Sequence, residues 1–219
     1  DGYIPVCHLY STFAQRAYDQ IIHDVALQNL PVIFCLDRSG LVGEDGATHH
    51  GAFDISFLNA IPNIVLSSPM DGDSLSALLR HGLEAKRPFV IRYNKGGNLD
   101  TNDGANLEFK EGRWLKKGKN KVVISYGFIG QEAKKALKDS EYAHFDLVYL
   151  KPMGLEVKNI LKEYKEVITL EEGSFSGGLG QTILSLKNEL NLETKVNCLH
   201  LPEKFVEHGT REELLAKLG

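Results

Sequence analysis

Short apolar runs alternate with amphipathic stretches along the whole chain. In the first half, the stretch after the first apolar run carries Phe13, Ala17, Ile21 and Val25 at helical spacing, and a second helix is expected to begin at Asp71. The order is strand, helix, strand, loop, strand, helix, strand, which predicts right-handed crossovers and a parallel sheet. The apolar runs of strand length cover residues 4–9, 31–36, 63–67 and 88–93.

The second half resumes the alternation after a polar stretch. Residues 94–106 are rich in Gly, Asn and Asp, and residues 109–117 alternate weakly around Gly112, which predicts a linker with a small hairpin. Thr210 and Glu213 form a capping box that opens a terminal helix. Further strands are expected over residues 122–126, 146–150, 167–170 and 196–201, and helices over residues 131–137, 156–164 and 181–190.

The length of 219 residues accommodates two such units of about a hundred residues each. A parallel sheet needs helices on both faces. We therefore predict an α/β fold of two three-layer domains with mostly parallel sheets. The first domain is expected at residues 1–97, the linker with its small hairpin at 98–119, and the second domain at 120–219.

Composition and charge exclude several classes of protein. Hydrophobic residues make up 42% and charged residues 25%, near globular averages, so disorder and fibrous repeats are excluded. The net charge of −4 disfavours non-specific nucleic-acid binding, and no apolar stretch approaches the ~20 residues that cross a bilayer. Neither a nucleic acid nor a membrane is an expected partner. Cys7, Cys35 and Cys198 form no CxxC pair and are interpreted as reduced, mostly buried thiols of a cytosolic-type protein, without a metal site.

The chain opens with Asp1-Gly2-Tyr3, without a methionine or a signal segment, and runs almost directly into a strand. We interpret this as the middle of a longer polypeptide, so that targeting signals are not readable from it.

The most informative polar segment is residues 37–51, DRSGLVGEDGATHHG, which contains four glycines, three carboxylates, an arginine and two histidines. It follows the most apolar strand, and ligands of parallel sheets bind beyond the carboxyl ends of strands. Polar loops of this length serve binding or catalysis more often than packing, the alternative being a solvated surface loop. A metal pair at His49 and His50 is less favoured, because adjacent residues of an extended chain point in opposite directions and Asp45 alone does not complete a ligand set.

Three other segments are candidates for a chemical role. Residues 10–13 lie where a strand feeds a helix N-terminus, a natural cofactor edge, although spacing alone makes Phe13 a core residue. Residues 173–180 follow a strand and open a helix but match neither GxGxxG nor a P-loop, so we interpret them as a tight turn with close helix packing. The lysine-rich residues 116–119 are interpreted as a solvated hinge.

Several short runs of the sequence form a combined pattern: YSTFAQRAYDQ (10–20), DRSGLVGEDGATH (37–49), GAFD (51–54), Ser68-Pro69, LEEGS (170–174), Gly177-Gly178 and FVEHGTREEL (205–214). Together these runs resemble the 1-deoxy-D-xylulose-5-phosphate synthase family. The resemblance covers essentially the whole chain, and the first two runs separate this family from transketolases and from the β subunits of 2-oxo acid dehydrogenases, which share the fold.

The resemblance implies an enzyme that joins pyruvate to D-glyceraldehyde 3-phosphate with loss of CO₂, giving a precursor of isoprenoids, thiamine and pyridoxal. Its cofactors would be thiamine diphosphate and Mg²⁺. The chain would comprise most of the pyrimidine-binding domain, truncated at its N-terminus, and all of the transketolase C-terminal domain. The diphosphate and metal sites would lie in a missing N-terminal domain, so the chain is expected to be inactive alone. A cytoplasmic homodimer of bacterial type is expected, and plastid targeting stays open.

The resemblance also implies roles for residues at the cofactor. Phe13 matches the residue that stacks on the pyrimidine ring, and Tyr10 and Arg16 match nearby active-site positions.

On the substrate side, Arg38 matches an arginine that clamps the acceptor phosphate, and Asp45 and His49 match polar active-site residues. His49 is expected to exchange a proton with the aldehyde oxygen, with Asp45 orienting it or contacting a substrate hydroxyl. The family usually has Pro-Arg-Gly where this chain has Asn94-Lys95-Gly96. Lys95 keeps the charge of the second phosphate ligand but loses its two-pronged geometry.

Two other classes of function stay open. A separate C-terminal subunit of a transketolase or of a 2-oxo acid dehydrogenase-like enzyme is one, but its loop should lack the DGxTHxG run. A non-catalytic α/β interaction module is the other. Its active-site loop should have lost the polar residues of the motif, whereas Arg38, Asp45 and His49 are all present here.

Overall fold

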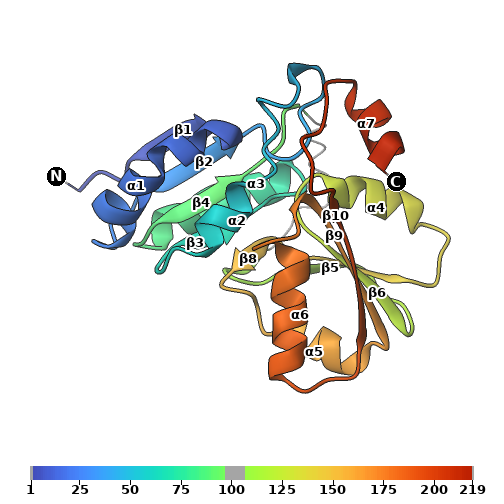
Figure 1. Ribbon diagram of the computed structural model, residues 1–219. Coiled ribbons are helices and arrows are strands. Elements are labelled where there is room, and N and C mark those ends of the chain that lie inside the picture. Colours follow the sequence, from blue (N-terminus) through green and yellow to red (C-terminus); the bar gives the residue numbers. More distant parts are fainter. Residues whose placement is uncertain (1, 97–106, 219) are drawn as a thin grey trace.

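The computed structural model describes residues 2–96 and 107–218. Two five-stranded sheets, each with helices packed against it, lie side by side (Figure 1). Most neighbouring strands in both sheets are parallel. The predicted α/β class with two mostly parallel sheets is confirmed.

The first sheet has the strand order β1-β2-β4-β3-β8, in which only the β3–β8 pair is antiparallel. Strand β2 is buried along its apolar length, as expected for a central strand covered on both faces. The strands are β1 (Val6–Tyr10), β2 (Ile33–Asp37), β3 (Val65–Ser67), β4 (Phe89–Arg92) and β8 (Tyr149–Lys151).

The helices of this half pack on both faces of the sheet. The predicted first helix is one irregular helical run, with 3₁₀ geometry over Ser11–Ala17, the short α1 (Tyr18–Gln20) and π geometry over Ile21–Ala26. On the other face lies α3 (Gly72–Glu84), whose first turn is capped where predicted, because Asp71 Oδ1 accepts a 2.9 Å hydrogen bond from the backbone N–H of Ser74.

The second sheet has the order β10-β9-β6-β7-β5, in which only β5–β7 is antiparallel. Helix α4 (Ile129–Ala136) contacts β6, β7 and β9. Helices α5 (Glu156–Glu163) and α6 (Leu179–Glu189) pack into the main core. Helix α7 (Arg211–Leu218) follows the predicted Thr210–Glu213 capping box. The strands are β5 (Arg113–Lys116), β6 (Lys121–Ser125), β7 (Ala143–Asp146), β9 (Glu166–Ser174) and β10 (Lys195–Leu201).

Two predictions about strands are wrong. The single strand expected over residues 146–150 is split, because β7 ends at Asp146 and β8 begins at Tyr149 in the other sheet. Val148 has a φ of 55°, so the chain turns between them. The small hairpin expected around Gly112 is also wrong for residues 107–117, since β5 pairs with β7; residues 98–106 of the predicted linker lie outside the described part of the chain.

The interpretation of residues 116–119 as a solvated hinge is wrong at its first lysine. The ammonium group of Lys116 donates to the carbonyls of Leu137, at 2.6 Å, Lys138 and Ser140, just after α4. The lysine therefore donates to carbonyl groups in the turn that follows a helix, where intrahelical partners run out.

One helix was not predicted. The six-residue α2 (Asp54–Asn59) lies inside the segment that we expected to be a loop. It is too short to show a clear period, and its buried face is reduced to Asp54, Ile55 and Leu58.

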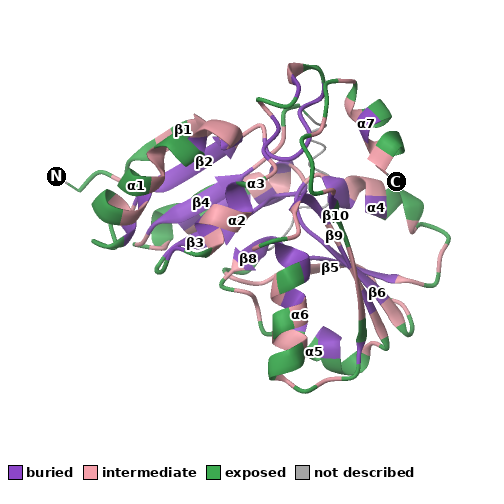
Figure 2. Ribbon diagram, viewed as in Figure 1, coloured by how far each residue is buried: buried purple, intermediate pink, exposed green. Residues whose placement is uncertain are grey.

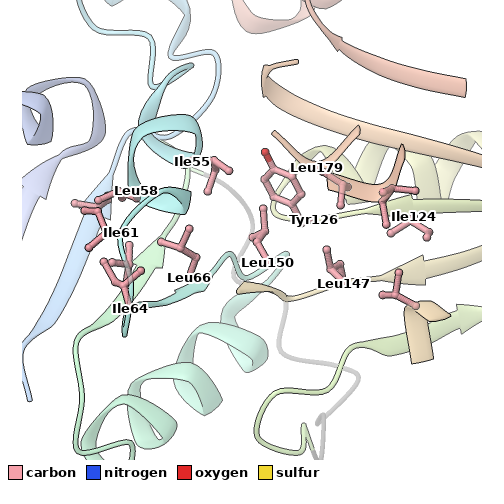
Figure 3. Packing of buried hydrophobic residues seen from close by; sticks show 14 of the residues in the cluster. Ile55, Leu58, Ile61, Ile64, Leu66, Ile124, Tyr126, Leu147, Leu150 and Leu179 are labelled. Carbon is pink, nitrogen blue, oxygen red and sulfur yellow. The ribbon is translucent and has the colours of Figure 1, made fainter. Parts of the chain in front are cut away.

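The main hydrophobic core is continuous between the two halves. Figure 3 shows Ile55 and Leu66 of the first half next to Tyr126 and Leu150 of the second. The central strands of both sheets are buried, while the outward faces of the helices are exposed (Figure 2). The two halves therefore form one packed body.

The described part of the chain contains no helix both long enough and apolar enough to span a membrane. The three cysteines are unpaired; Cys35 is buried, and Cys7 and Cys198 are half-buried.

Candidate active site

The loop that follows β2 is closed at its base by backbone hydrogen bonds. Gly40 and Gly51 exchange two N–H to carbonyl bonds, both of 2.9 Å. Arg38 adopts a left-handed conformation with φ 60°, and its N–H donates to the carboxylate of Asp37. A non-glycine residue held in this region is uncommon and is characteristic of functional turns. The loop therefore presents Arg38 at the carboxyl edge of the first sheet.

Aromatic rings line one side of this edge. Tyr10 and Phe13 are stacked with their ring centroids 5.8 Å apart. The guanidinium carbon of Arg16 lies 5.2 Å from the centre of the Phe13 ring, and His49 meets the same ring edge-on at 5.4 Å. Phe13 is only half-buried, so it is not the plain core residue that spacing alone suggested.

Charged groups line the other side. The guanidinium of Arg38 lies 4.0 Å from the centre of the Tyr10 ring, and its Nε is 3.9 Å from Oδ2 of Asp45. Lys95 Nζ donates to the same oxygen at 2.7 Å. The hydrogen bond from Lys95, together with the nearby charges of His49 and Arg38, holds the pKa of Asp45 below its usual value. Asp45 is therefore an anion shared by two cations.

The imidazole of His49 is held by threonines. Its Nδ1 lies 2.9 Å from Oγ1 of Thr48, and Thr12 Oγ1 donates to the carbonyl of Thr48 at 3.2 Å. The expectation that Asp45 orients His49 does not match this geometry, because the carboxylate of Asp45 bonds to Lys95 instead. Thr48 is a site residue that sequence reasoning did not single out.

All seven residues expected in the site are brought together. The contacts run from Arg16 to Phe13, on to Tyr10 and His49, and from Tyr10 through Arg38 and Asp45 to Lys95. The arrangement combines a flat apolar surface, an imidazole and two cations. Such groups are able to stack a ring, exchange a proton and bind a phosphate.

A buried ion pair supports the site from below, and sequence reasoning missed it. Arg92 Nε and Ser11 Oγ both donate to Oδ2 of Asp54 at 2.8 Å, and Arg92 Nη2 donates to the carbonyls of Gly51 and Glu172 at 2.9 and 3.1 Å. Burial opposes the charge of Arg92, but the pairing with Asp54 outweighs it and raises the pKa of Arg92. An arginine inside the apolar run PFVIRY was the available signal, since a buried charge requires a partner.

The glycine-rich turn after β9 is not an anion site. The carboxylate of Glu171 accepts hydrogen bonds of 2.9 Å from the backbone N–H groups of Leu179 and Gly180, which open α6. A Cβ atom at Gly178 would lie 2.3 Å from the carbonyl oxygen of Ser174. The interpretation as a tight turn with close packing is confirmed. In the residues that the structure describes, no group of three or more His, Cys, Asp or Glu side chains forms a metal site.

Comparisons with known proteins identify both halves of the chain. Residues 1–98 match the model of the transketolase pyrimidine binding domain, and residues 110–219 match that of the transketolase C-terminal domain. The proteins named 1-deoxy-D-xylulose-5-phosphate synthase from Bacteroides thetaiotaomicron and Phocaeicola vulgatus are each 44% identical to the chain, over 100% and 98% of its length. The chain spans 36% of the length of each of these relatives.

A solved structure titled "Split gene transketolase, inactive beta4 tetramer" superposes with a TM-score of 0.81 at 25% identity, covering 100% of this chain and 72% of that one. The two domain matches together account for nearly the whole sequence. The chain therefore belongs to the transketolase family, with the pyrimidine binding domain followed by the C-terminal domain.

Proposed function

We propose that this chain forms the pyrimidine-binding and C-terminal part of a thiamine-diphosphate-dependent enzyme. This enzyme joins pyruvate to D-glyceraldehyde 3-phosphate, releases CO₂ and produces 1-deoxy-D-xylulose 5-phosphate. The observation that carries the proposal is the contiguous cluster from Arg16 through Phe13, Tyr10 and Arg38 to Asp45 and Lys95. The printed names of the relatives with 44% identity support the substrate pair.

The residues present fit the pyrimidine end of the cofactor. The half-buried ring of Phe13 offers a face for stacking, and Tyr10 and Arg16 flank it. When bound, thiamine diphosphate supplies the electron sink for the loss of CO₂ from pyruvate. We propose that its diphosphate and Mg²⁺ are held by a protein portion that corresponds to the remaining length of the relatives.

The two cations hold the phosphate of the acceptor aldehyde. Arg38 provides a planar donor pair suited to two phosphate oxygens, and Lys95 provides a point charge at the other side of Asp45. Once the phosphate is bound, the reacting aldehyde carbon lies a fixed distance from these cations. A three-carbon phosphorylated aldehyde is therefore preferred over its unphosphorylated form.

His49 exchanges the proton at the acceptor oxygen. Its ring is half-buried, lies against Phe13 and has Nδ1 bonded to Thr48. The opposite nitrogen, Nε2, is the one that faces the proton transfer, because Thr48 occupies Nδ1. Asp45, which is bonded to Lys95, contacts the substrate hydroxyl rather than acting through His49.

A second candidate is a separate subunit of a split transketolase. It is favoured by the structural neighbour, whose title describes a split-gene transketolase in an inactive tetramer. The identity to that protein is 25%, against 44% to the synthases, so we rank the synthase first. We further propose a homodimer in a bacterial cytoplasm, from the family resemblance alone.

The test is reconstitution of an enzyme from this chain and a protein portion that corresponds to the remaining length of the relatives. With pyruvate, glyceraldehyde 3-phosphate, thiamine diphosphate and Mg²⁺, the complete enzyme should release CO₂ and form the five-carbon product. Transfer from a ketose phosphate without CO₂ release would favour the transketolase subunit. Calorimetry on the chain alone should detect no cofactor binding, and micromolar Mg²⁺-dependent binding would contradict the proposed division of the site.

A further inference from the structure

The second histidine of the loop has a different environment from the first. His50 is only 5% exposed. Its Nδ1 accepts a 3.1 Å hydrogen bond from the backbone N–H of Val42, and its Nε2 lies 3.1 Å from the carbonyl oxygen of Glu207. Because Nδ1 is an acceptor, the proton of the neutral ring is on Nε2, which donates to Glu207. Both ring nitrogens are thus used inside the protein.

One of these two bonds is local to the loop, and the other joins it to a distant part of the sequence. Val42 and His50 lie on opposite arms of the loop that carries Asp45 and His49, so the first bond closes the loop. Glu207 lies 157 residues further along, in the segment that leads into α7. The second bond therefore fastens the loop to the C-terminal segment, residues 205–211.

Close packing surrounds the fastening. A Cβ atom at Gly46 would lie 3.2 Å from Cβ of His208, and one at Gly43 would lie 3.3 Å from the carbonyl oxygen of Gly209. The loop residue Leu41 packs in a small core with Leu214 of α7. In Figure 1 the C-terminal segment runs beside this loop before it enters α7.

An ion pair holds the base of the same segment. Arg211 Nη2 donates to Glu172 at 2.6 Å, and Glu172 lies so close to Gly40 that a Cβ atom there would meet its carboxylate at 2.6 Å. The ion pair therefore ties Arg211, at the end of the C-terminal segment, to a residue that packs against Gly40 at the base of the loop. The close approaches at Gly43 and Gly46, together with the ion pair between Arg211 and Glu172, fix the position of the loop relative to the C-terminal segment.

We propose that His50 is a positioning residue, which sets the places of Asp45 and His49 by fastening their loop to the C-terminal segment. The inference rests on the proposed function for its consequence in catalysis, but not for the fastening itself. The second domain contributes none of the seven residues of the site, and through His50 it sets the geometry of two of them, Asp45 and His49.

The first arm of the test measures amide hydrogen exchange of residues 42–50 in the full chain. His50→Ala removes both bonds and should accelerate exchange about tenfold or more, as expected for the loss of buried hydrogen bonds. His50→Asn offers an acceptor near the place of Nδ1 and His50→Gln a donor near that of Nε2, so each should restore part of the protection. Glu207→Ala is the matched control, because its bond uses the backbone oxygen and its side chain is exposed.

The second arm measures steady-state kinetics in the reconstituted enzyme. His50→Ala should lower kcat about tenfold with both phosphorylated and unphosphorylated acceptors, His50→Gln should recover part of the rate, and Glu207→Ala should match the wild type. Wild-type kcat in His50→Ala would overturn the positioning role. If His50→Ala does not fold, unchanged exchange in the Gln and Asn variants would overturn the fastening. An inactive wild-type enzyme would refute the proposed function instead, while exchange still decides the fastening.

Discussion

The ammonium group of Lys95 lies 2.7 Å from Oδ2 of Asp45, across fifty residues of sequence. Lys95 stands where the resemblance leads one to expect an arginine, and it already has an anionic partner. Arg38 approaches the same oxygen at 3.9 Å. A phosphate that uses both cations must therefore compete with the carboxylate of Asp45.

The competition predicts an unusual effect of neutralising Asp45. Asp45→Asn removes the anion and should strengthen binding of inorganic phosphate to the full chain severalfold, while kcat of the complete enzyme falls. Isothermal calorimetry at low salt measures the first effect. Weaker phosphate binding in this variant would mean that Asp45 helps to build the anion site rather than to occupy it.

Lys95 itself should contribute to the acceptor KM. Lys95→Ala should raise the KM for glyceraldehyde 3-phosphate, whereas Lys95→Arg, which restores a planar donor pair, should preserve or lower it. Initial rates at saturating pyruvate give both values. Wild-type kinetics in Lys95→Ala would show that Lys95 does not bind the phosphate and only forms part of a solvated turn.

Substitutions of Arg38 and His49 should have different kinetic effects when a phosphorylated and an unphosphorylated aldehyde are compared. Arg38→Ala removes a charge-assisted phosphate contact worth about 1.5–3 kcal/mol, so the KM for the phosphorylated aldehyde should rise about tenfold or more while unphosphorylated glyceraldehyde is nearly unaffected. His49→Ala should lower kcat with both aldehydes, because proton exchange at the carbonyl is needed for each. Equal losses with both acceptors in both variants would show that the loop acts as one structural unit.

Breaking the buried Arg92–Asp54 pair should lower the free energy of unfolding far more than breaking an exposed ion pair. Asp54→Ala leaves the Arg92 guanidinium, 3% exposed, without its carboxylate and should cost about 3–5 kcal/mol in the free energy of unfolding. The matched control is Asp19→Ala, which breaks an exposed pair with His23 and should change little. Urea unfolding of the two variants provides the comparison, and similar midpoints would contradict it.

Stability should also fall in mild acid through His144. Burial, with a smaller effect of Lys134, lowers the pKa of His144 to about 4, so the ring is neutral in the folded chain and protonated first in the unfolded chain. The free energy of unfolding is therefore unaffected by His144 above pH 6.5. It decreases as the pH falls towards 4, by up to about 3 kcal/mol.

A matched variant isolates this contribution. His144→Gln removes the titration but keeps a partner for Ser125, whose hydroxyl lies 2.8 Å from Nε2. The difference in unfolding free energy between wild type and variant should therefore change between pH 6.5 and 4. A constant difference over that range would assign the acid sensitivity to other groups.

Periodicity and local signals were sufficient to predict most of the fold. Continuous apolar runs predicted the parallel strands, and Asp71 and Thr210 marked helix starts because capping is a local interaction. The split at Val148 was not predictable in this way, since an unbroken apolar run gives no sign that its two ends pair in different sheets. Register between distant strands is a tertiary property.

The seven site residues came from motifs, and the structure brings them together, but their pairings were only partly foreseen. Asp45 was expected either to orient His49 or to contact a substrate hydroxyl, and in the structure its carboxylate is bonded to Lys95, because the distance between two loops decides the partner. Thr48 carries no chemical signature of its own, and the Arg92–Asp54 pair is signalled only by an arginine inside an apolar run, which does not identify the partner. They are recognised only when burial and hydrogen-bond partners are known.

Strand β8 limits how this protein can be recombined. It belongs to the second half of the chain but forms the antiparallel edge of the first sheet, against β3. A chimera that exchanges the first domain at the linker would bring a foreign β3 to this strand, and a first domain produced separately would expose β3 as an unpaired edge, prone to intermolecular association. In any domain exchange, β3 and β8 must therefore come from the same protein.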